Sequence, residues 1–117
     1  MPRLNRPVGV LIVAGAYLAV GIIGFVFHFH DLLANPSEGV WIELTELVAA
    51  ITGVFLLRRH NWARWLAVAW IAFHVGLSAF GKIGELTTHL VMAVLIVWLL
   101  FRAQSARWFR SPGAEPI

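Results

Sequence analysis

The sequence contains no cysteine and few charged residues. Without cysteine the chain has no disulfide and no thiolate metal ligand, so thiol–disulfide chemistry is excluded. Charged residues make up 13% of the chain, against about 25% in an ordinary soluble domain. Hydrophobic residues make up 60% of the 117 residues, and this composition excludes an intrinsically disordered chain.

The apolar content also excludes a soluble fold. A soluble chain of this length leaves a large part of its surface in water and cannot bury so many apolar side chains. The composition therefore predicts an integral membrane protein.

Four apolar stretches, residues 8–29, 40–57, 62–80 and 83–101, are separated by short polar segments. Each has about 18–22 residues, which as a helix crosses a hydrocarbon core of about 30 Å. The first stretch is too long for the apolar region of a signal peptide, so we expect a retained helix. The short connections predict an all-α, up-down-up-down bundle of four membrane helices in a single domain over residues 1–117.

The basic residues predict the orientation of this bundle. Of the nine Lys and Arg residues only Lys82 falls on one side of the four spans. The other eight are Arg3, Arg6, Arg58, Arg59, Arg64, Arg102, Arg107 and Arg110. The positive-inside rule then places both termini in the cytoplasm. On this prediction residues 102–117 form a basic cytoplasmic tail, and we expect its first part to be a short interfacial helix. This orientation, together with contacts to anionic lipid, explains the sequence pI of about 10.7 better than nucleic-acid binding does.

Small residues predict how the helices pack, because helices in lipid associate most closely where side chains are small. The pairs with the required spacing are Gly15 with Ala19, Ala49 with Gly53, Ala63 with Ala67, and Ala72 with Gly76. Steps of three and four residues also give one stripe per helix that joins small residues to polar ones. The stripes are Ala14, Tyr17, Gly21, Gly24 and His28; Glu43, Glu46, Ala50, Gly53 and Leu57; Ala63, Ala67, Trp70 and His74; and Glu85, His89, Met92 and Ile96. We expect the four stripes to face one another.

The polar members of these stripes share one depth. Counting 1.5 Å per residue, they lie within about 10 Å of the outer ends of the spans. They are His28, Glu43, Glu46, His74 and His89. Buried polar groups need partners, so one interpretation is a structural network of Glu46, His74, His89 and Tyr17.

Three functional interpretations of the polar layer stay open beside the structural one. A divalent metal or a haem could bind, with His74 and His89 as ligands from adjacent helices. A quinone, a lipid or another small molecule could exchange protons with Glu46 or His74. A transporter is disfavoured, because the inner half of the bundle offers no ionisable group. A surface metal site at His28, His30 and Asp31 is a further, weaker possibility.

The segment Leu56–Ser78, LLRRHNWARWLAVAWIAFHVGLS, resembles a pattern in small uncharacterised four-helix bacterial membrane proteins. In these proteins a span with an early Glu ends in Leu-Leu-Arg, and a Trp-Ala-Arg-Trp turn precedes a span with a His. The resemblance extends loosely over Leu86–Phe109, and more distantly the arrangement resembles DoxX-like proteins, which are sometimes associated with quinone-linked redox systems. The resemblance implies a location in the bacterial inner membrane.

Together these observations predict a small multi-pass membrane protein that acts as a non-catalytic subunit or accessory protein. The alternative is a metal-, haem- or quinone-binding redox protein with its site near the outer leaflet. The expected partners are the lipid bilayer and either other membrane proteins or a second copy of the chain, with no nucleic acid.

Overall fold

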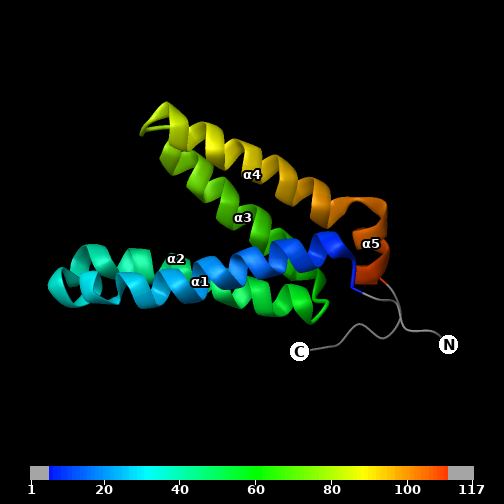
Figure 1. The fold of residues 1–117 in the computed structure, drawn as a ribbon, viewed down its shortest axis with the longest axis horizontal. Helices are drawn as coiled ribbons and strands as arrows, with labels where there is room; N and C mark the ends of the chain where they lie inside the picture. Colours follow the sequence, from blue (N-terminus) through cyan, green and yellow to red (C-terminus); the bar gives the residue numbers. More distant parts are fainter. Residues whose placement is uncertain (1–5, 111–117) are drawn as a thin grey trace.

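The computed structural model describes residues 6–110, and within this range the regular structure is entirely helical (Figure 1). The helices are α1 (Val8–Ala34), α2 (Pro36–Leu57), α3 (Asn61–Ser78), α4 (Ile83–Phe101) and α5 (Ala103–Arg110). Three of them, α1, α2 and α4, are long and apolar enough to cross a membrane. The polar side chains of Asn61, Arg64 and His74 lower the hydropathy of α3, which has only 18 residues.

Four boundaries differ from the predicted spans, among them the start of α3 at Asn61, one residue before the expected Trp62, while α4 matches the predicted 83–101. Helix α1 continues five residues past the expected end at Phe29, and α2 begins at Pro36, so Asn35 alone connects them. Proline is well suited to the first position of a helix, where no backbone N–H is needed, and this is why Pro36 begins α2 rather than forming a longer turn. The third helix ends at Ser78, two residues before the expected Phe80.

Helices α1 and α2 form the first hairpin, which packs along the small residues of their stripes. A side chain on Gly21 would collide with the backbone of Ala50. One on Gly53 would come within 2.9 Å of the carbonyl oxygen of Ala14. The stripe prediction is therefore confirmed for this pair of helices.

Of the other small-residue pairs, Ala49 with Gly53 and Ala63 with Ala67 are buried as expected, but the prediction is wrong for Gly15 with Ala19 and for Ala72 with Gly76, which are exposed. Nothing lies within 4 Å of where a side chain would start on Gly15 or Gly76, and both glycines are exposed. Spacing alone does not select the packed face, and in α1 the contact is made by the side that carries Ala14 and Gly21.

Helices α3 and α4 form the second hairpin, and the two hairpins diverge along their length (Figure 1). They meet at the end that holds the α2–α3 turn and α5, which we call the basic end, and separate toward the other end, which we call the open end. The buried core lies where they meet. It contains Val10, Val13, Ala14, Tyr17, Ala49, Leu56, Ala63, Ala67, Ile71, Ile96, Leu100, Trp108 and Phe109. The four stripes thus face one another at the basic end and only in pairs at the open end.

Helix α5 turns back at Arg102 and packs against the basic end. Trp108 and Phe109 are buried, and the Nε of Arg59 donates a hydrogen bond of 2.7 Å to the carbonyl oxygen of Trp108. The Oγ of Ser105 donates to the carbonyl oxygen of Leu99 at 2.5 Å. The tail up to residue 110 is thus helical as expected, but it buries its apolar side chains in the protein. The rest of the predicted tail lies outside the described residues.

Candidate functional site

The polar side chains of the first hairpin gather at the open end, where Gly24 of α1 leaves room for Glu46 of α2. A side chain on Gly24 would collide with the Glu46 carboxylate. His28 lies one turn further along α1, and its Nδ1 is 4.0 Å from Oε1 of Glu46. The His28 Nδ1–H donates to the carbonyl oxygen of Gly24 at 2.9 Å, while Oε2 of Glu46 has no hydrogen-bond partner within residues 6–110.

Glu43 lies about one turn from Glu46, on the side of α2 that faces α1. Its side chain is 4% exposed, and neither carboxylate oxygen has a hydrogen-bond partner in the described part of the chain. Gly39 and Ala50 on the same side contact α1, which explains the burial of Glu43. The first hairpin therefore carries two acidic side chains with unused acceptor oxygens.

The second hairpin carries a separate polar set, built from His74, His89 and Ser78. The Nδ1–H of His74 donates to the carbonyl oxygen of Trp70 at 2.9 Å. The Nδ1 of His89 lies 2.6 Å from Oγ of Ser78 and 2.8 Å from the carbonyl oxygen of Glu85. Ser78 in turn donates to the carbonyl oxygen of His74 at 2.8 Å, and the two imidazole centres are 6.0 Å apart.

These hydrogen bonds place a proton on Nδ1 in all three histidines. Each uses Nδ1 as the donor to a carbonyl four residues earlier. In a neutral imidazole the other nitrogen is then an acceptor. Nε2 of His28, His74 and His89 therefore offers a lone pair, in addition to the free oxygens of Glu43 and Glu46. The open end is rich in acceptors.

Tyr17 lies away from these groups, where the hairpins begin to separate. Its hydroxyl donates to the carbonyl oxygen of Ala67 in α3 at 2.6 Å, and its ring centre is 5.3 Å from that of Trp70. The indole Nε1 of Trp70 donates to the carbonyl oxygen of Thr45 in α2 at 2.8 Å. Tyr17 and Trp70 thus connect the two hairpins through backbone carbonyls.

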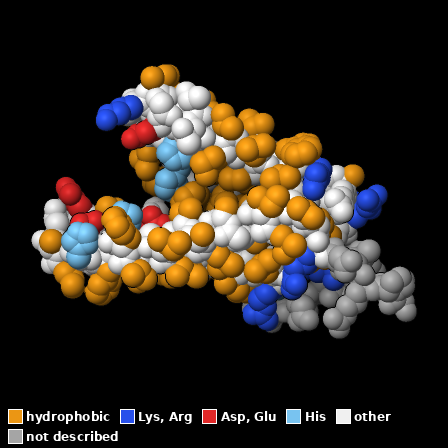
Figure 2. Space-filling model, viewed as in Figure 1, with side chains coloured by type: hydrophobic (Ala, Val, Ile, Leu, Met, Phe, Trp, Pro, Cys, Tyr) orange, Lys and Arg blue, Asp and Glu red, His pale blue; other side chains and the backbone are white. Residues whose placement is uncertain are grey.

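The single polar network of Glu46, His74, His89 and Tyr17 is not formed. Across residues 6–110 no hydrogen bond or ion pair links the acids of the first hairpin to the histidines of the second. Figure 2 shows the two polar sets on opposite sides of a notch between the hairpins. Within the described range no three His, Asp or Glu side chains are close enough together to hold a metal ion. His30 and Asp31, with His30 Nε2 3.1 Å from Oδ1 of Asp31, form an exposed pair on α1.

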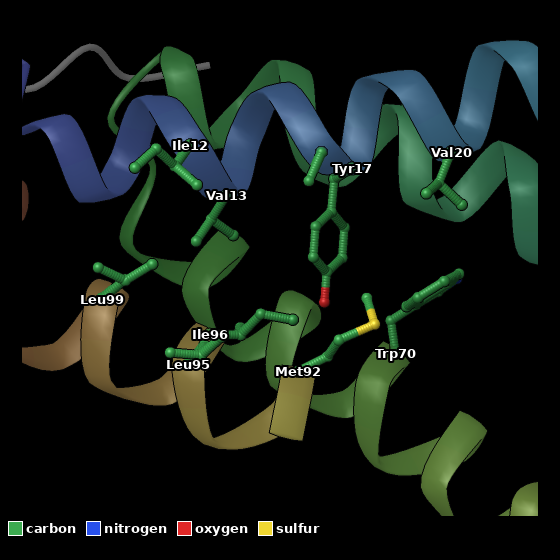
Figure 3. Close-up of a pocket in the computed structure, with 10 residues that line it drawn as sticks. Ile12, Val13, Tyr17, Val20, Trp70, Met92, Leu95, Ile96 and Leu99 are labelled. Carbon is green, nitrogen blue, oxygen red and sulfur yellow. The ribbon is translucent and has the colours of Figure 1, made fainter. Parts of the chain in front are cut away.

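An apolar cavity of about 160 Å³ lies at the base of the notch, between α1, α3 and α4 (Figure 3). Figure 3 shows Tyr17, Trp70 and Met92 around it. The remaining lining residues are Ile12, Val13, Ala16, Val20, Leu95, Ile96 and Leu99. An apolar cavity of about 150 Å³ can hold benzene, so this one has the size of a six-membered ring. Ile12 and Leu95 are 56% and 49% exposed, so the cavity is reached from the apolar outer surface.

The cavity and the histidines are neighbours. The Trp70 ring, which lines the cavity, stacks on His74 with 3.9 Å between ring centres. Met92 lies one turn from His89 on α4. A molecule in the cavity therefore lies one helical turn from two imidazole acceptors.

Sequence reasoning missed Ser78 and the cavity. Ser78 lies four residues after His74, so one further step along the α3 stripe would have included it. The cavity depends on the angle between the hairpins, although four of its residues, Tyr17, Trp70, Met92 and Ile96, are stripe members.

A comparison of the chain with protein-family models, curated proteins and solved structures finds no match. The resemblance to four-helix and DoxX-like proteins stays a prediction. The function is therefore argued from the residues of the site.

Proposed function

We propose that α1 to α4 all cross the inner membrane of a bacterium, with the basic end in the cytoplasm and the open end at the outer leaflet. Helix α3 has 18 residues, which lies within the range of about 17–25 residues found for membrane-spanning helices. The separation of charge supports this orientation. Arginines gather at the basic end, while the acidic side chains of residues 6–110 lie toward the open end (Figure 2).

We further propose that the protein binds a lipophilic ring compound that carries hydroxyl groups, such as a reduced quinone, between its two hairpins. The observation that carries this proposal is a ring-sized apolar cavity lined by Trp70, whose ring stacks on His74, with an acceptor-rich notch beyond it. Ligand sites are commonly apolar pockets with a few polar groups that set orientation. The cavity holds the ring or its apolar substituents, and the notch receives the polar groups.

The unused acceptor atoms at the open end favour the reduced form of such a ligand. A quinone carbonyl only accepts hydrogen bonds, and so do an ionised Glu46 carboxylate and Nε2 of a neutral His74 or His89. A quinol hydroxyl donates, so it matches these atoms. We assign to this chain binding and presentation of the ligand and no chemical step of its own. It acts as an accessory subunit to a membrane redox partner.

The proposal is tested with the full chain purified in detergent and titrated with three ligands while tryptophan fluorescence is recorded. The ligands are a short-chain alkylated benzoquinol, its oxidised quinone and its dimethyl ether, which has nearly the same size without hydroxyl donors. We expect the quinol to bind saturably, with an affinity at least about five-fold higher than that of the ether. This difference corresponds to the contribution of one or two hydrogen bonds.

Two variants and a matched control locate the site. Glu46→Gln and His74→Phe are expected to reduce the preference for the quinol. His30→Gln is expected to leave it unchanged, because His30 is 75% exposed and bonded within α1. Equal affinity for quinol and ether, or an unchanged preference in His74→Phe, contradicts the proposal.

A further inference from the structure

The described part of the basic end carries many cations and no acidic partner. Within residues 6–110 it holds Arg6, Arg58, Arg59, Arg64, Arg102, Arg107 and Arg110. The acidic residues of the same range are Asp31, Glu38, Glu43, Glu46 and Glu85, and all lie on the open-end side (Figure 2). No salt bridge between an arginine and a carboxylate is formed in this range. The positive charge of the basic end is therefore not neutralised by the described protein.

The inner arginines satisfy their hydrogen bonds with neutral groups. Arg64 is 7% exposed and donates to the carbonyl oxygen of Leu100 at 3.2 Å and to the side chain of Asn61. Its guanidinium also lies 4.5 Å from the ring centre of Phe101 and 4.9 Å from that of Phe109. Carbonyl and ring contacts hold a guanidinium in place, but they bring no negative charge.

Arg102 is less satisfied than Arg64. Its Nε is buried and has no hydrogen-bond partner among residues 6–110, although its guanidinium lies 5.0 Å from the ring centre of Trp98. A side chain on Gly9 would approach Nη2 of Arg102 to 3.1 Å, so the guanidinium reaches the first turn of α1. Leaving a buried donor unpaired is costly, and more so for a charged group.

We propose that the basic end binds the headgroup of an anionic phospholipid, with Arg102 and the exposed Arg107 and Arg110 of α5 as its cationic ligands. A guanidinium binds phosphate oxygens through two parallel hydrogen bonds, which the neutral partners described above do not supply. The position of the patch selects a lipid over free phosphate. Exposed Trp62, Trp65 and Trp98 flank the basic end, and exposed tryptophans mark the membrane–water interface.

This site is independent of the notch at the open end. The experiment adds phosphatidylglycerol, phosphatidylcholine with the same acyl chains, or inorganic phosphate to the full chain in detergent. The midpoint of thermal unfolding is measured for each, together with the amount of bound lipid by native mass spectrometry. We expect phosphatidylglycerol to raise the midpoint and to bind, while the other two leave the midpoint unchanged.

The variants separate this site from nonspecific attraction. Arg102→Gln and the exposed pair Arg107→Gln with Arg110→Gln are each expected to weaken phosphatidylglycerol binding by about five-fold per arginine removed. Lys82→Gln, which removes one positive charge at the open end, is the matched control and is expected to bind as the parent does. His74→Phe, which alters the notch, is likewise expected to keep the lipid response.

Three results overturn the proposal. The first is an equal response to phosphatidylcholine, and the second is an equal response to inorganic phosphate at the same concentration. The third is a loss in Lys82→Gln as large as that in Arg102→Gln. If Arg102→Gln does not fold, the exposed double variant decides the question, since neither of its side chains is buried.

Discussion

Trp70 stacks its indole on the imidazole of His74, with 3.9 Å between the ring centres. The same indole donates to the carbonyl oxygen of Thr45 in the other hairpin, beside the bond from Tyr17 to Ala67. Beyond these two bonds, toward the open end, no hydrogen bond or ion pair between the hairpins occurs in residues 6–110. Trp70 and Tyr17 therefore form the last hydrogen bonds between the hairpins before they separate, and we expect any change in the angle between the hairpins to occur about this point.

The first prediction concerns that angle. We expect a bound quinol to narrow the distance between spin labels at Val26→Cys and Phe80→Cys, since both positions are exposed near the open end. Labels at Val8→Cys and Trp98→Cys, near the basic end, are expected to keep their distance. Pulsed electron–electron double resonance measures both pairs, and the absence of native cysteine means that no other residue is labelled. A change of similar size in both label-to-label distances contradicts a pivot at Trp70.

The second prediction concerns the contact between α1 and α2. Gly21→Leu is expected to lower the free energy of unfolding by about 1–3 kcal/mol or more, because the side chain collides with the Ala50 backbone. Gly15→Leu is the matched control on the same helix and is expected to be tolerated, since nothing lies within 4 Å of its side-chain position. Thermal unfolding in detergent distinguishes the two, and equal midpoints would show that Gly21 is not packed.

The third prediction concerns the attachment of α5. Arg64→Lys removes the planar guanidinium between Phe101 and Phe109 and its bond to the Leu100 carbonyl. Hydrogen bonds from charged groups contribute about 1.5–3 kcal/mol, so we expect trypsin to cleave after Arg107 about ten-fold faster or more. Arg58→Lys, at an exposed position, is the control. An unchanged cleavage rate in Arg64→Lys would mean that Arg64 does not hold α5.

The fourth prediction concerns the orientation in the membrane. In intact cells a membrane-impermeant maleimide is expected to label Ser37→Cys and Gly81→Cys, which lie at exposed ends of the two hairpins. Asn61→Cys, in the first turn of α3 at the basic end, is expected to react only after lysis. Labelling of Asn61→Cys in intact cells reverses the proposed topology.

The helices and one packing contact could be predicted from the sequence because both depend on local pattern. Apolar length predicted α1, α2 and α4, and the stripe of Gly21, Gly24 and Gly53 predicted the face on which α1 and α2 meet. Gly15 has the same spacing signal and is exposed. A periodicity indicates which residues share a face, but the partner helix decides which face is used.

The arrangement of the site could not be predicted in the same way. Depth counting placed Glu46 and His74 at one level, but it carries no information on the angle between helices, and within residues 6–110 no hydrogen bond or ion pair links the two residues. The boundary at Pro36 was misjudged because proline both ends turns and begins helices. The fold of α5 depends on Trp108 and Phe109 reaching a surface formed by residues far earlier in the chain.

The exposure of the cavity wall determines whether a ligand enters the cavity from water or from the bilayer. Ile12 and Leu95 are exposed, so in the proposed membrane arrangement we expect a lipophilic ligand to arrive by lateral diffusion within the bilayer and not through water. Its occupancy is then governed by its mole fraction in the membrane, where such compounds concentrate by partitioning. A dissociation constant near 1 mM, with concentration counted per volume of membrane, corresponds to only about 4 kcal/mol of binding free energy, which a ring-sized cavity and one or two hydrogen bonds can supply.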